Sequence, residues 1–216
     1  METSTRNSFD RLAPVYDFLG TIAFAGQLHA SQRALLQAVP PRQRVLVIGG
    51  GTGRFLGEFL THDTQADVVY VDPSAAMLAR ARHRVNPHDS GRVIFLHGSV
   101  DAITPDDRFD LICTQCVLDC FSPDELLPFM QRLDANLEPG GAWLFHDFHT
   151  ADGTAFSRLW RRSVVWALYR FFRLTTDISA RALPPMLPTF ADLGYTETAG
   201  TSHCGGLLIG RLLEKG

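Results

Sequence analysis

The 216-residue chain lacks the features that mark a membrane-spanning or secreted protein. No apolar run reaches the ~18 residues needed to span a bilayer, because arginines interrupt the longest candidate, at residues 154–174. The N-terminal stretch METSTRNSFD lacks the basic-then-apolar pattern of a secretory signal peptide. We therefore expect a cytoplasmic protein.

Cysteine and net charge are both low. The four cysteines do not have the pattern of a small disulfide-rich protein, and the run through Cys113, Cys116 and Cys120 has no second C-x₂-C pair to complete a zinc site. We predict no metal and place Cys113 within a buried strand. A formal net charge of −3 argues against nonspecific nucleic-acid binding as the main activity.

Short apolar runs rich in β-branched residues recur along the chain, at residues 44–48, 67–71, 92–96, 109–113 and 142–146. Stretches with helical spacing separate most of them. Continuously apolar strands that alternate with helices indicate a parallel sheet covered on both faces. We predict an α/β fold of the Rossmann-like, doubly wound type, with a mostly parallel sheet that two C-terminal strands complete to seven.

Four glycines lie within the five residues of GGGTG (49–53), directly after the first predicted strand. A glycine in a packed element costs roughly 0.5–1 kcal/mol relative to alanine, so we expect this loop to turn sharply against a ligand. The spacing G-x-G-x-G does not supply the third glycine of the dinucleotide fingerprint in any register. An NAD(P)-dependent oxidoreductase is therefore a disfavoured alternative.

The motifs, taken in order, resemble those of class I S-adenosylmethionine (SAM)-dependent methyltransferases. RVLVIGGGTG resembles the family's first motif, VVYVDPSAAMLARAR its second, FDLICTQCVLDCF its fourth-strand motif and LEPGGAWLFHDF its turn into strand five. SFDRLAPVYDFL is similar to an N-terminal segment of the ubiquinone/menaquinone-biosynthesis group. The resemblance covers roughly residues 9–148.

This resemblance implies SAM as the cofactor, S-adenosylhomocysteine (SAH) as its product and a small-molecule methyl acceptor. Asp72, at the end of the second strand, is expected to accept hydrogen bonds from the ribose hydroxyls, as acidic residues do in dinucleotide sites. Capping of the next helix is its alternative role. The residues expected at the cofactor are Tyr16, Gly49, Gly51, Gly53, Asp72, Pro73, Ser99, Val100 and Gln115.

Two departures from the family pattern bear on the cofactor. Val47 replaces an acidic residue that is common in the first strand, and Ser99 replaces the aspartate of a Gly-Asp pair that receives the adenine amino group. A hydroxyl accepts a weaker hydrogen bond than a carboxylate, and Asp101 is an alternative acceptor. These departures keep a second alternative open, a non-catalytic SAM-binding protein.

Candidates for the acceptor side follow the fourth and fifth strands. Asp119 follows the fourth, while His146 and His149 belong to HDFH at the end of the fifth. We predict that these three residues are catalytic, because many methyl acceptors need a base. The alternative for each histidine is a packed or solvated loop residue.

The stretch TAFSRLWRRSVVWALYRFFRL (154–174) has helical spacing. Plotted at 100° per residue, one broad apolar face contains Phe156, Leu159, Trp160, Val164, Ala167, Phe171 and Leu174. Arginines collect on the other face. Three interpretations remain: the apolar face packs on the domain, the helix is a lid over a lipophilic acceptor, or residues 156–174 contact an anionic membrane peripherally.

We predict a single methyltransferase domain over residues 1–216. The expected acceptor is hydrophobic or aromatic, of the quinol or phenol kind. The predicted parts are an N-terminal helical cap (1–40), a cofactor-binding core (41–150), a helical insertion or lid (151–186) and C-terminal strands (187–216).

Overall fold

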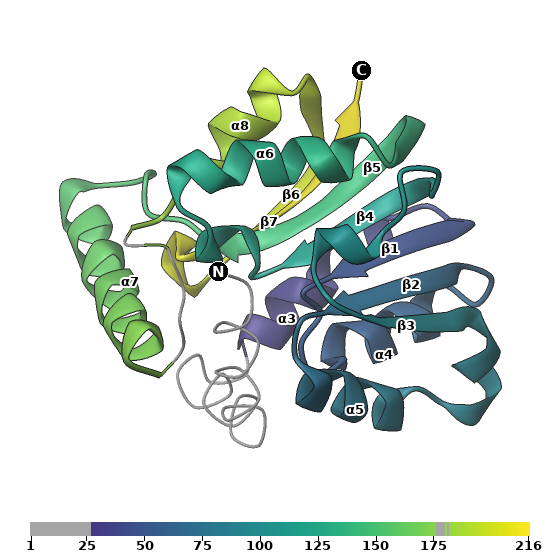
Figure 1. The fold of residues 1–216 in the computed structure, drawn as a ribbon. Coiled ribbons are helices and arrows are strands. Elements are labelled where there is room, and N and C mark those ends of the chain that lie inside the picture. The colour runs from purple at the N-terminus through teal and green to yellow at the C-terminus, as the bar shows by residue number, and fades with distance from the viewer. Residues whose placement is uncertain (1–26, 176–179, 181) are drawn as a thin grey trace.

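In the computed structural model, residues 27–175, 180 and 182–216 are described. Seven strands form one sheet of order β3-β2-β1-β4-β5-β7-β6 (Figure 1). The strands are β1 (Arg44–Ile48), β2 (Asp67–Asp72), β3 (Val93–His97), β4 (Phe109–Gln115), β5 (Leu137–Phe148), β6 (Tyr195–His203) and β7 (Leu208–Lys215). The first five strands run parallel, and β7 is antiparallel to both β5 and β6. The predicted doubly wound, mostly parallel sheet is confirmed.

Helices cover both faces of the sheet (Figure 1). The helices are α3 (Gln27–Ala34), α4 (Arg54–His62), α5 (Ala75–Arg84), α6 (Pro123–Asp134), α7 (Ala155–Thr175) and α8 (Met186–Asp192), with short 3₁₀ turns η1 (Leu36–Ala38), η2 (Pro87–Arg92), η3 (Val100–Ala102), η4 (Leu118–Cys120) and η5 (Cys204–Gly206). Because strand side chains alternate, Val45 and Val47 join the core beneath α4 and α5. Leu46 and Ile48 join the core beneath α6 and α8.

Three helices begin at the carboxyl edge of the parallel strands, each with a local start signal. Gly53, in the left-handed region at φ 81°, precedes α4. The Ser74 side chain accepts a hydrogen bond from Met77 N–H at the start of α5. A capping box of Ser122 and Glu125 begins α6. The first turns of these helices and the strand ends therefore share one edge of the sheet.

The face on which α7 packs differs from the predicted one. Its buried residues are Arg161, Val165 and Tyr169, whereas Phe156 and Leu159 of the predicted apolar face are exposed. Two polar contacts explain the choice, because Arg161 donates to the Gly206 carbonyl and the Tyr169 hydroxyl donates to the Asp119 carbonyl. Of the three interpretations of residues 154–174, packing of the broad apolar face on the domain is contradicted by the exposure of Phe156, Leu159 and Trp160.

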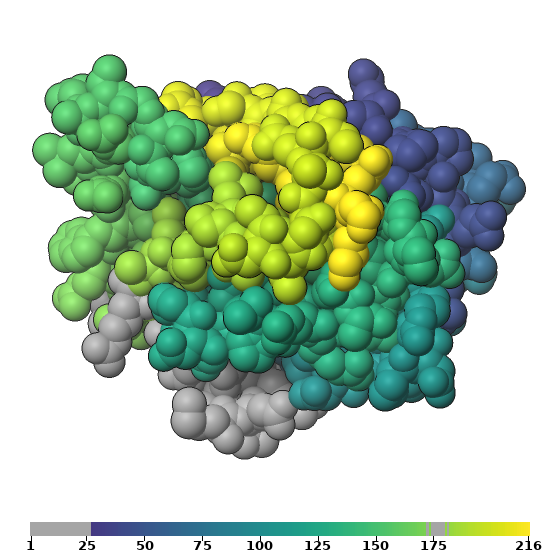
Figure 2. Space-filling model, turned by 90° about the horizontal axis from the view of Figure 1, so that it is seen from above, coloured from purple at the N-terminus to yellow at the C-terminus, as the bar shows by residue number. Residues whose placement is uncertain are grey.

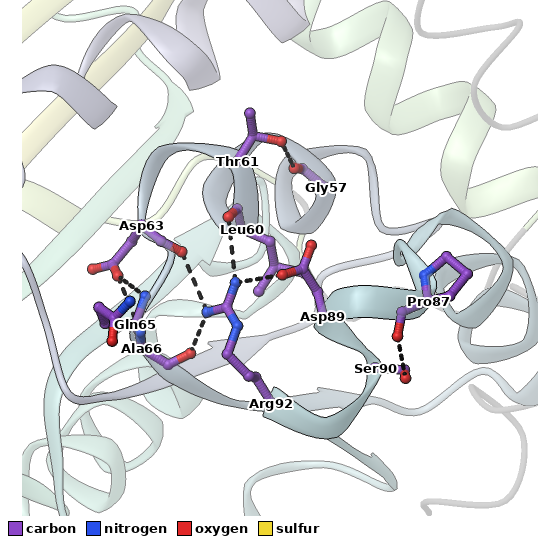
Figure 3. Close-up of polar contacts among 10 residues, drawn as sticks. All are labelled: Gly57, Leu60, Thr61, Asp63, Gln65, Ala66, Pro87, Asp89, Ser90 and Arg92. Carbon is purple, nitrogen blue, oxygen red and sulfur yellow. Dashed lines mark hydrogen bonds and ion pairs between the residues drawn. The ribbon is translucent and has the colours of Figure 1, made fainter.

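Arg92 ties the end of α4 to the turn that leads into β2 (Figure 3). Its guanidinium donates to the carbonyls of Leu60, Asp63 and Ala66 and forms an ion pair with Asp89 at 2.7 Å. Cations at a helix C-terminus satisfy carbonyls that have no intrahelical partner. This cluster fixes the amino end of β2, at the edge of the sheet opposite the glycine loop.

Candidate active site

The glycine loop joins β1 to α4 with three backbone conformations that favour glycine. Gly49, Gly51 and Gly53 have φ values of 64°, 62° and 81°. A Cβ on Gly53 would lie 2.7 Å from the Cα of Ala81, so close packing of α5 requires that glycine. A Cβ on Gly51 would meet nothing within 4 Å. Gly51 therefore borders open space in which a ligand can approach the backbone.

Asp72 lies at the end of β2, directly beside this loop. Its buried carboxylate accepts a hydrogen bond from Gly51 N–H at 2.8 Å through Oδ2 and one from Ser74 N–H at 2.9 Å through Oδ1. Because Ser74 itself caps α5, Asp72 does not serve as the helix cap. A carboxylate offers about four acceptor positions, so Asp72 can hold the loop and still accept bonds from vicinal hydroxyls.

Gln115 ends β4 at the same edge of the sheet. Its side chain is buried, and its Nε2 donates to the Leu144 carbonyl at 3.3 Å. Its Oε1 has no hydrogen-bond partner among the described residues. An unsatisfied buried acceptor costs about 1–3 kcal/mol, which a donor on a bound ligand would offset. The open side of Gly51, Asp72 and this orphaned oxygen together fit a polar cofactor such as SAM.

The remaining predicted cofactor residues follow β2 and β3. The Pro73 carbonyl lies 2.9 Å from the His97 imidazole, and the exposed Ser99 hydroxyl donates a long, 3.5 Å bond to Asp101. Val100 packs partly against the core beneath α6 and α8. Tyr16 lies outside the described residues. The cofactor roles of these four residues stay predictions.

Two carboxyl groups form a buried pair where the acceptor side is predicted. Asp119, in η4, donates its backbone N–H to Oδ2 of Asp147, in β5, at 3.2 Å. Both side chains are buried, and the Cys120 thiol donates to Asp119 Oδ1 at 3.6 Å. Burial raises the pKa of Asp119 to about 6 and that of Asp147 well above its usual range, the latter also because of the Asp119 charge. The pair therefore binds a proton far more readily than exposed aspartates do.

The acid pair lies next to the glycine loop. A Cβ on Gly49 would come within 2.6 Å of Val117 Cγ2, so the loop after β4 packs directly on the loop after β1. Cys116, which precedes Val117, has φ 58°, an uncommon conformation for a residue other than glycine. Such strain concentrates at functional sites. The fold thus packs Val117, two residues before Asp119, on the predicted cofactor loop.

His146 faces α3 from β5. Its Nε2 lies 2.6 Å from the Ser31 hydroxyl and its Nδ1 3.6 Å from the Cys116 thiol. Ser31 donates its one proton to the Leu28 carbonyl, so it must accept from a protonated Nε2. Burial, with a smaller contribution from His203, lowers the pKa of His146 to about 3. A neutral ring with both nitrogens engaged is a weak base, and its catalytic role stays a prediction.

His149 lies beyond the end of β5, where its ring contacts a neighbouring carboxylate. Its Nε2 is 3.0 Å from the exposed Asp152 carboxylate, and its backbone N–H donates to the Leu207 carbonyl. The structure describes no contact between His149 and Asp119. Its predicted catalytic role is not tested.

Sequence reasoning did not single out Tyr169 or Ser31 as site residues, and it noted Asp147 as part of HDFH but left it out of the predicted catalytic set. Asp147 sits between the two predicted histidines, and strand alternation would have separated it from His146 and pointed it to the other face. No local pattern reveals Ser31, which is 115 residues from its partner His146. Cys113 lies in β4 and is fully buried, as predicted.

Comparisons with known proteins agree with this geometry. The model of a methyltransferase domain family matches residues 45–141. The ubiquinone/menaquinone biosynthesis C-methyltransferase UbiE of Methylobacterium nodulans is 28% identical over 162 residues, covering 70% of this chain and 62% of that protein. UbiE of Syntrophotalea carbinolica is 28% identical over 209 residues, covering 92% and 86%.

The solved structures add a likeness of fold. The N-methyltransferase NodS from Bradyrhizobium japonicum WM9, in complex with SAH, superposes with a TM-score of 0.69 at 15% identity and covers 98% of both chains. The chain spans less than two thirds of the length of the first curated relative. With the glycine loop and Asp72 in place on this sheet, the matches identify a methyltransferase domain over residues 45–141, in a chain that is similar to the SAM-dependent methyltransferases of the ubiquinone/menaquinone-biosynthesis group.

Proposed function

We propose that this protein transfers a methyl group from SAM to a small, lipophilic aromatic acceptor of the quinol or phenol class. The observation that carries the proposal is the Asp72 carboxylate, held against the open side of Gly51 at the carboxyl edge of the sheet. The names of the UbiE relatives support an acceptor related to quinones. A phenol or quinol also suits a site whose polar groups are buried. Its hydroxyl groups can bond those polar groups, and the rest of the acceptor's surface is apolar.

Bound SAM supplies an electrophilic methyl group on a sulfonium, which leaves as a neutral thioether. Gly49, Gly51 and Gly53 provide the backbone cradle, and Asp72 is the proposed ribose acceptor. The Gln115 Oε1 is proposed to accept a hydrogen bond from the same cofactor, since no described residue satisfies it. Tyr16, Pro73, Ser99 and Val100 complete the proposed set.

The acid pair is proposed to receive the proton that the acceptor loses. As the acceptor oxygen or activated ring carbon forms its bond to the methyl group, its proton passes to the carboxylate of Asp119, and Asp147 stabilises the shared proton. A base whose pKa lies near the working pH is the most effective, and burial raises the pKa of Asp119 to about 6. This explains why two aspartates are buried beside the glycine loop.

His146 is proposed as a positioning residue. Its ring joins Ser31 on α3 to Cys116 after β4, so it fixes the strained loop that leads to Asp119. His149 remains a candidate for contact with the acceptor. His146 is a weaker base for the proton transfer than the Asp119–Asp147 pair, because burial lowers its pKa to about 3.

The test uses methyl-labelled SAM with catechols, soluble quinols and prenylated quinols, and it reads SAH release and product mass. We expect Asp119→Asn and Asp147→Asn to lower kcat/KM by about 10²–10⁴-fold, the usual contribution of a general base. Asp124→Asn, an exposed aspartate at the start of α6, is the matched control and should leave kcat/KM unchanged. The wild-type rate should rise with pH around 6. Full activity in both pair variants would overturn the proton assignment.

The proposed location is the cytoplasm, with peripheral membrane contact through residues 156–174. Among the described residues, no helix is long and apolar enough to cross a bilayer. A lipophilic acceptor concentrates in membranes, so an enzyme that uses it gains from binding at their surface.

A further inference from the structure

One face of α7 is exposed although it carries large apolar side chains. Phe156, Leu159, Trp160 and Trp166 are 82%, 66%, 48% and 67% exposed. Leu159, Trp160 and Trp166 follow Phe156 by three, four and ten residues, and this spacing places all four on one side of the helix. We name these four residues the exposed α7 face. No ring contact among the described residues involves Phe156, Trp160 or Trp166.

The opposite face of α7 is firmly attached to the domain. Val165 and Tyr169 pack with Phe148 and Leu208, and the Tyr169 hydroxyl bonds the Asp119 carbonyl at 2.8 Å. Rotation of α7 to bury the exposed face would break these contacts and expose the buried Arg161. Figures 1 and 2 show α7 at one margin of the molecule, outside the helical layers that cover the sheet.

Positive charge flanks the exposed α7 face. The helix contains arginine at positions 158, 161, 162, 170 and 173 and no aspartate or glutamate. Arg162, Arg170 and Arg173 are exposed, and they take part in none of the ion pairs that the described residues form. A helix that has an apolar face, tryptophans and arginines but no acidic residues is suited to the headgroup region of an anionic bilayer.

We infer that the exposed α7 face docks on a lipid bilayer that carries anionic headgroups, with Arg162, Arg170 and Arg173 at the phosphates. This inference rests on the proposed function, which includes peripheral membrane contact. It adds the surface that makes the contact and the charge of the lipid. The Tyr169–Asp119 hydrogen bond then places the acceptor-side acid one helix away from the lipid. A lipophilic acceptor can reach the site without crossing bulk water.

Charge favours lipid over the other occupants of this face. Residues 1–26 include Arg6 and Arg11 as well as Glu2, Asp10 and Asp17, so their charges nearly cancel and complement three arginines poorly. A second copy would bring the same arginines, and like charges would oppose one another. Each arginine near an anionic membrane surface strengthens binding of the protein to that surface by about fivefold.

The test measures binding of the full chain to phosphatidylcholine vesicles with and without phosphatidylglycerol, by co-sedimentation and by quenching from brominated lipids. Of the three tryptophans, Trp143 is fully buried, so quenching reports on Trp160 and Trp166. We expect binding and quenching with phosphatidylglycerol, weaker by at least about fivefold without it and weaker at high salt. Absence of binding, or equal binding to both vesicles, would overturn the inference.

Matched variants locate the surface. Trp160→Ser with Trp166→Ser should weaken vesicle binding by about tenfold or more, because the tryptophans anchor the face at the interface. Ile94→Ser with Leu127→Ser, at sites 58% and 41% exposed elsewhere, should leave it unchanged.

The charge variants follow the same design. Arg170→Glu should weaken vesicle binding by about fivefold or more, whereas Arg80→Glu, on the exposed side of α5, should not. Equal loss in a variant and its control would contradict the assignment of the surface.

Two further measurements separate the alternatives. If Trp160 and Trp166 resist acrylamide quenching without vesicles, another surface covers them and the inference fails; light scattering then shows whether that surface is a second copy. SAH titration of the same samples tests the proposed function independently. Normal SAH binding and methylation of a soluble quinol without vesicle binding would refute only the docking inference, and vesicle binding without SAH binding would refute only the proposed function.

Discussion

The backbone N–H of Gly51 donates a 2.8 Å hydrogen bond to Oδ2 of Asp72. This bond joins the loop after β1 to the end of β2, so the glycine cradle and the carboxylate keep a fixed separation before any ligand binds. Preorganisation of this kind avoids the cost of ordering a loop on binding. The two features on which the proposed cofactor site rests are thus one structural unit.

Replacement of Asp72 tests its proposed role at the cofactor. Asp72→Ala should weaken SAH binding by about 10-fold to 100-fold, since hydrogen bonds to a charged group contribute about 1.5–3 kcal/mol. Asp67→Ala, at the exposed opposite end of β2, is the control and should bind SAH as the wild type does. Isothermal titration gives both affinities. Unchanged binding in Asp72→Ala would exclude the ribose assignment.

Two glycines with similar positive φ values allow backbone strain to be distinguished from ligand contact. Gly51 and Gly140 have φ values of 62° and 73°, and a Cβ on either would meet nothing within 4 Å. Each change to alanine should lower the free energy of unfolding by about 1–2 kcal/mol, the cost of a left-handed residue with a side chain. Only Gly51→Ala should also weaken SAH binding. Equal SAH affinity in the two variants would show that no ligand lies against Gly51.

Local patterns predicted the sheet and the glycine loop. The runs at 44–48 and 67–71 are apolar on both faces, and their neighbours supply the turns, so strand order follows from known topology rules. Val45 and Val47 are buried beneath one helix layer and Leu46 beneath the other, which is why β1 has no polar residue after the exposed Arg44. Asp72 was predictable because it ends a strand that follows a glycine loop.

Long-range polar contacts explain what local patterns missed. Apolar periodicity selects the α7 face that contains Phe156, but Arg161 and Tyr169 find carbonyl partners at Gly206 and Asp119 and turn that face outward. Asp147 resembles any polar residue in a strand until η4 brings the Asp119 backbone to it. Such contacts depend on the assembled sheet.

The acid pair should make stability fall as pH rises. The folded-state pKa values of Asp119 and Asp147 lie above the ~3.9 of an unfolded aspartate, so the folded protein binds more protons from about pH 4 upward. Asp119→Asn removes one of these groups. The free energy of unfolding of this variant should exceed that of the wild type by on the order of 1–3 kcal/mol at pH 7.5. The gain should fall to about a third of that value at pH 4.5, as measured by urea unfolding. A gain that is equal at both pH values, or one also seen in Asp124→Asn, would contradict the shared-proton account.

Asp63 should show the opposite dependence on pH. Burial alone would raise its pKa, but the backbone N–H groups of Arg42, Gln65 and Ala66 donate to its carboxylate and, with Arg92, lower the pKa. Figure 3 shows Gln65, Ala66 and Arg92 around Asp63. Its stabilisation is complete above about pH 4 and is lost as pH falls through the folded-state pKa.

Asp63→Asn measures this stabilisation. The free energy of unfolding of the variant should be lower by about 1–2 kcal/mol at pH 7. The reason is that the side-chain NH₂ group of the asparagine would face a backbone N–H and could not accept its hydrogen bond. The difference should narrow as the pH is lowered below 4. Asp67→Asn is the exposed control, and a loss of similar size there would assign the effect to charge in general.

The most direct test of the account is calorimetric titration of the purified full chain with SAH, with NADH as the comparison. The glycine loop, Asp72 and the orphaned oxygen of Gln115 predict one SAH site with a Kd of about 1 μM, a binding free energy of about −8 kcal/mol. NADH should give no heat of binding. Failure of SAH to bind, or equal binding of NADH, would contradict the assignment of this edge of the sheet to SAM.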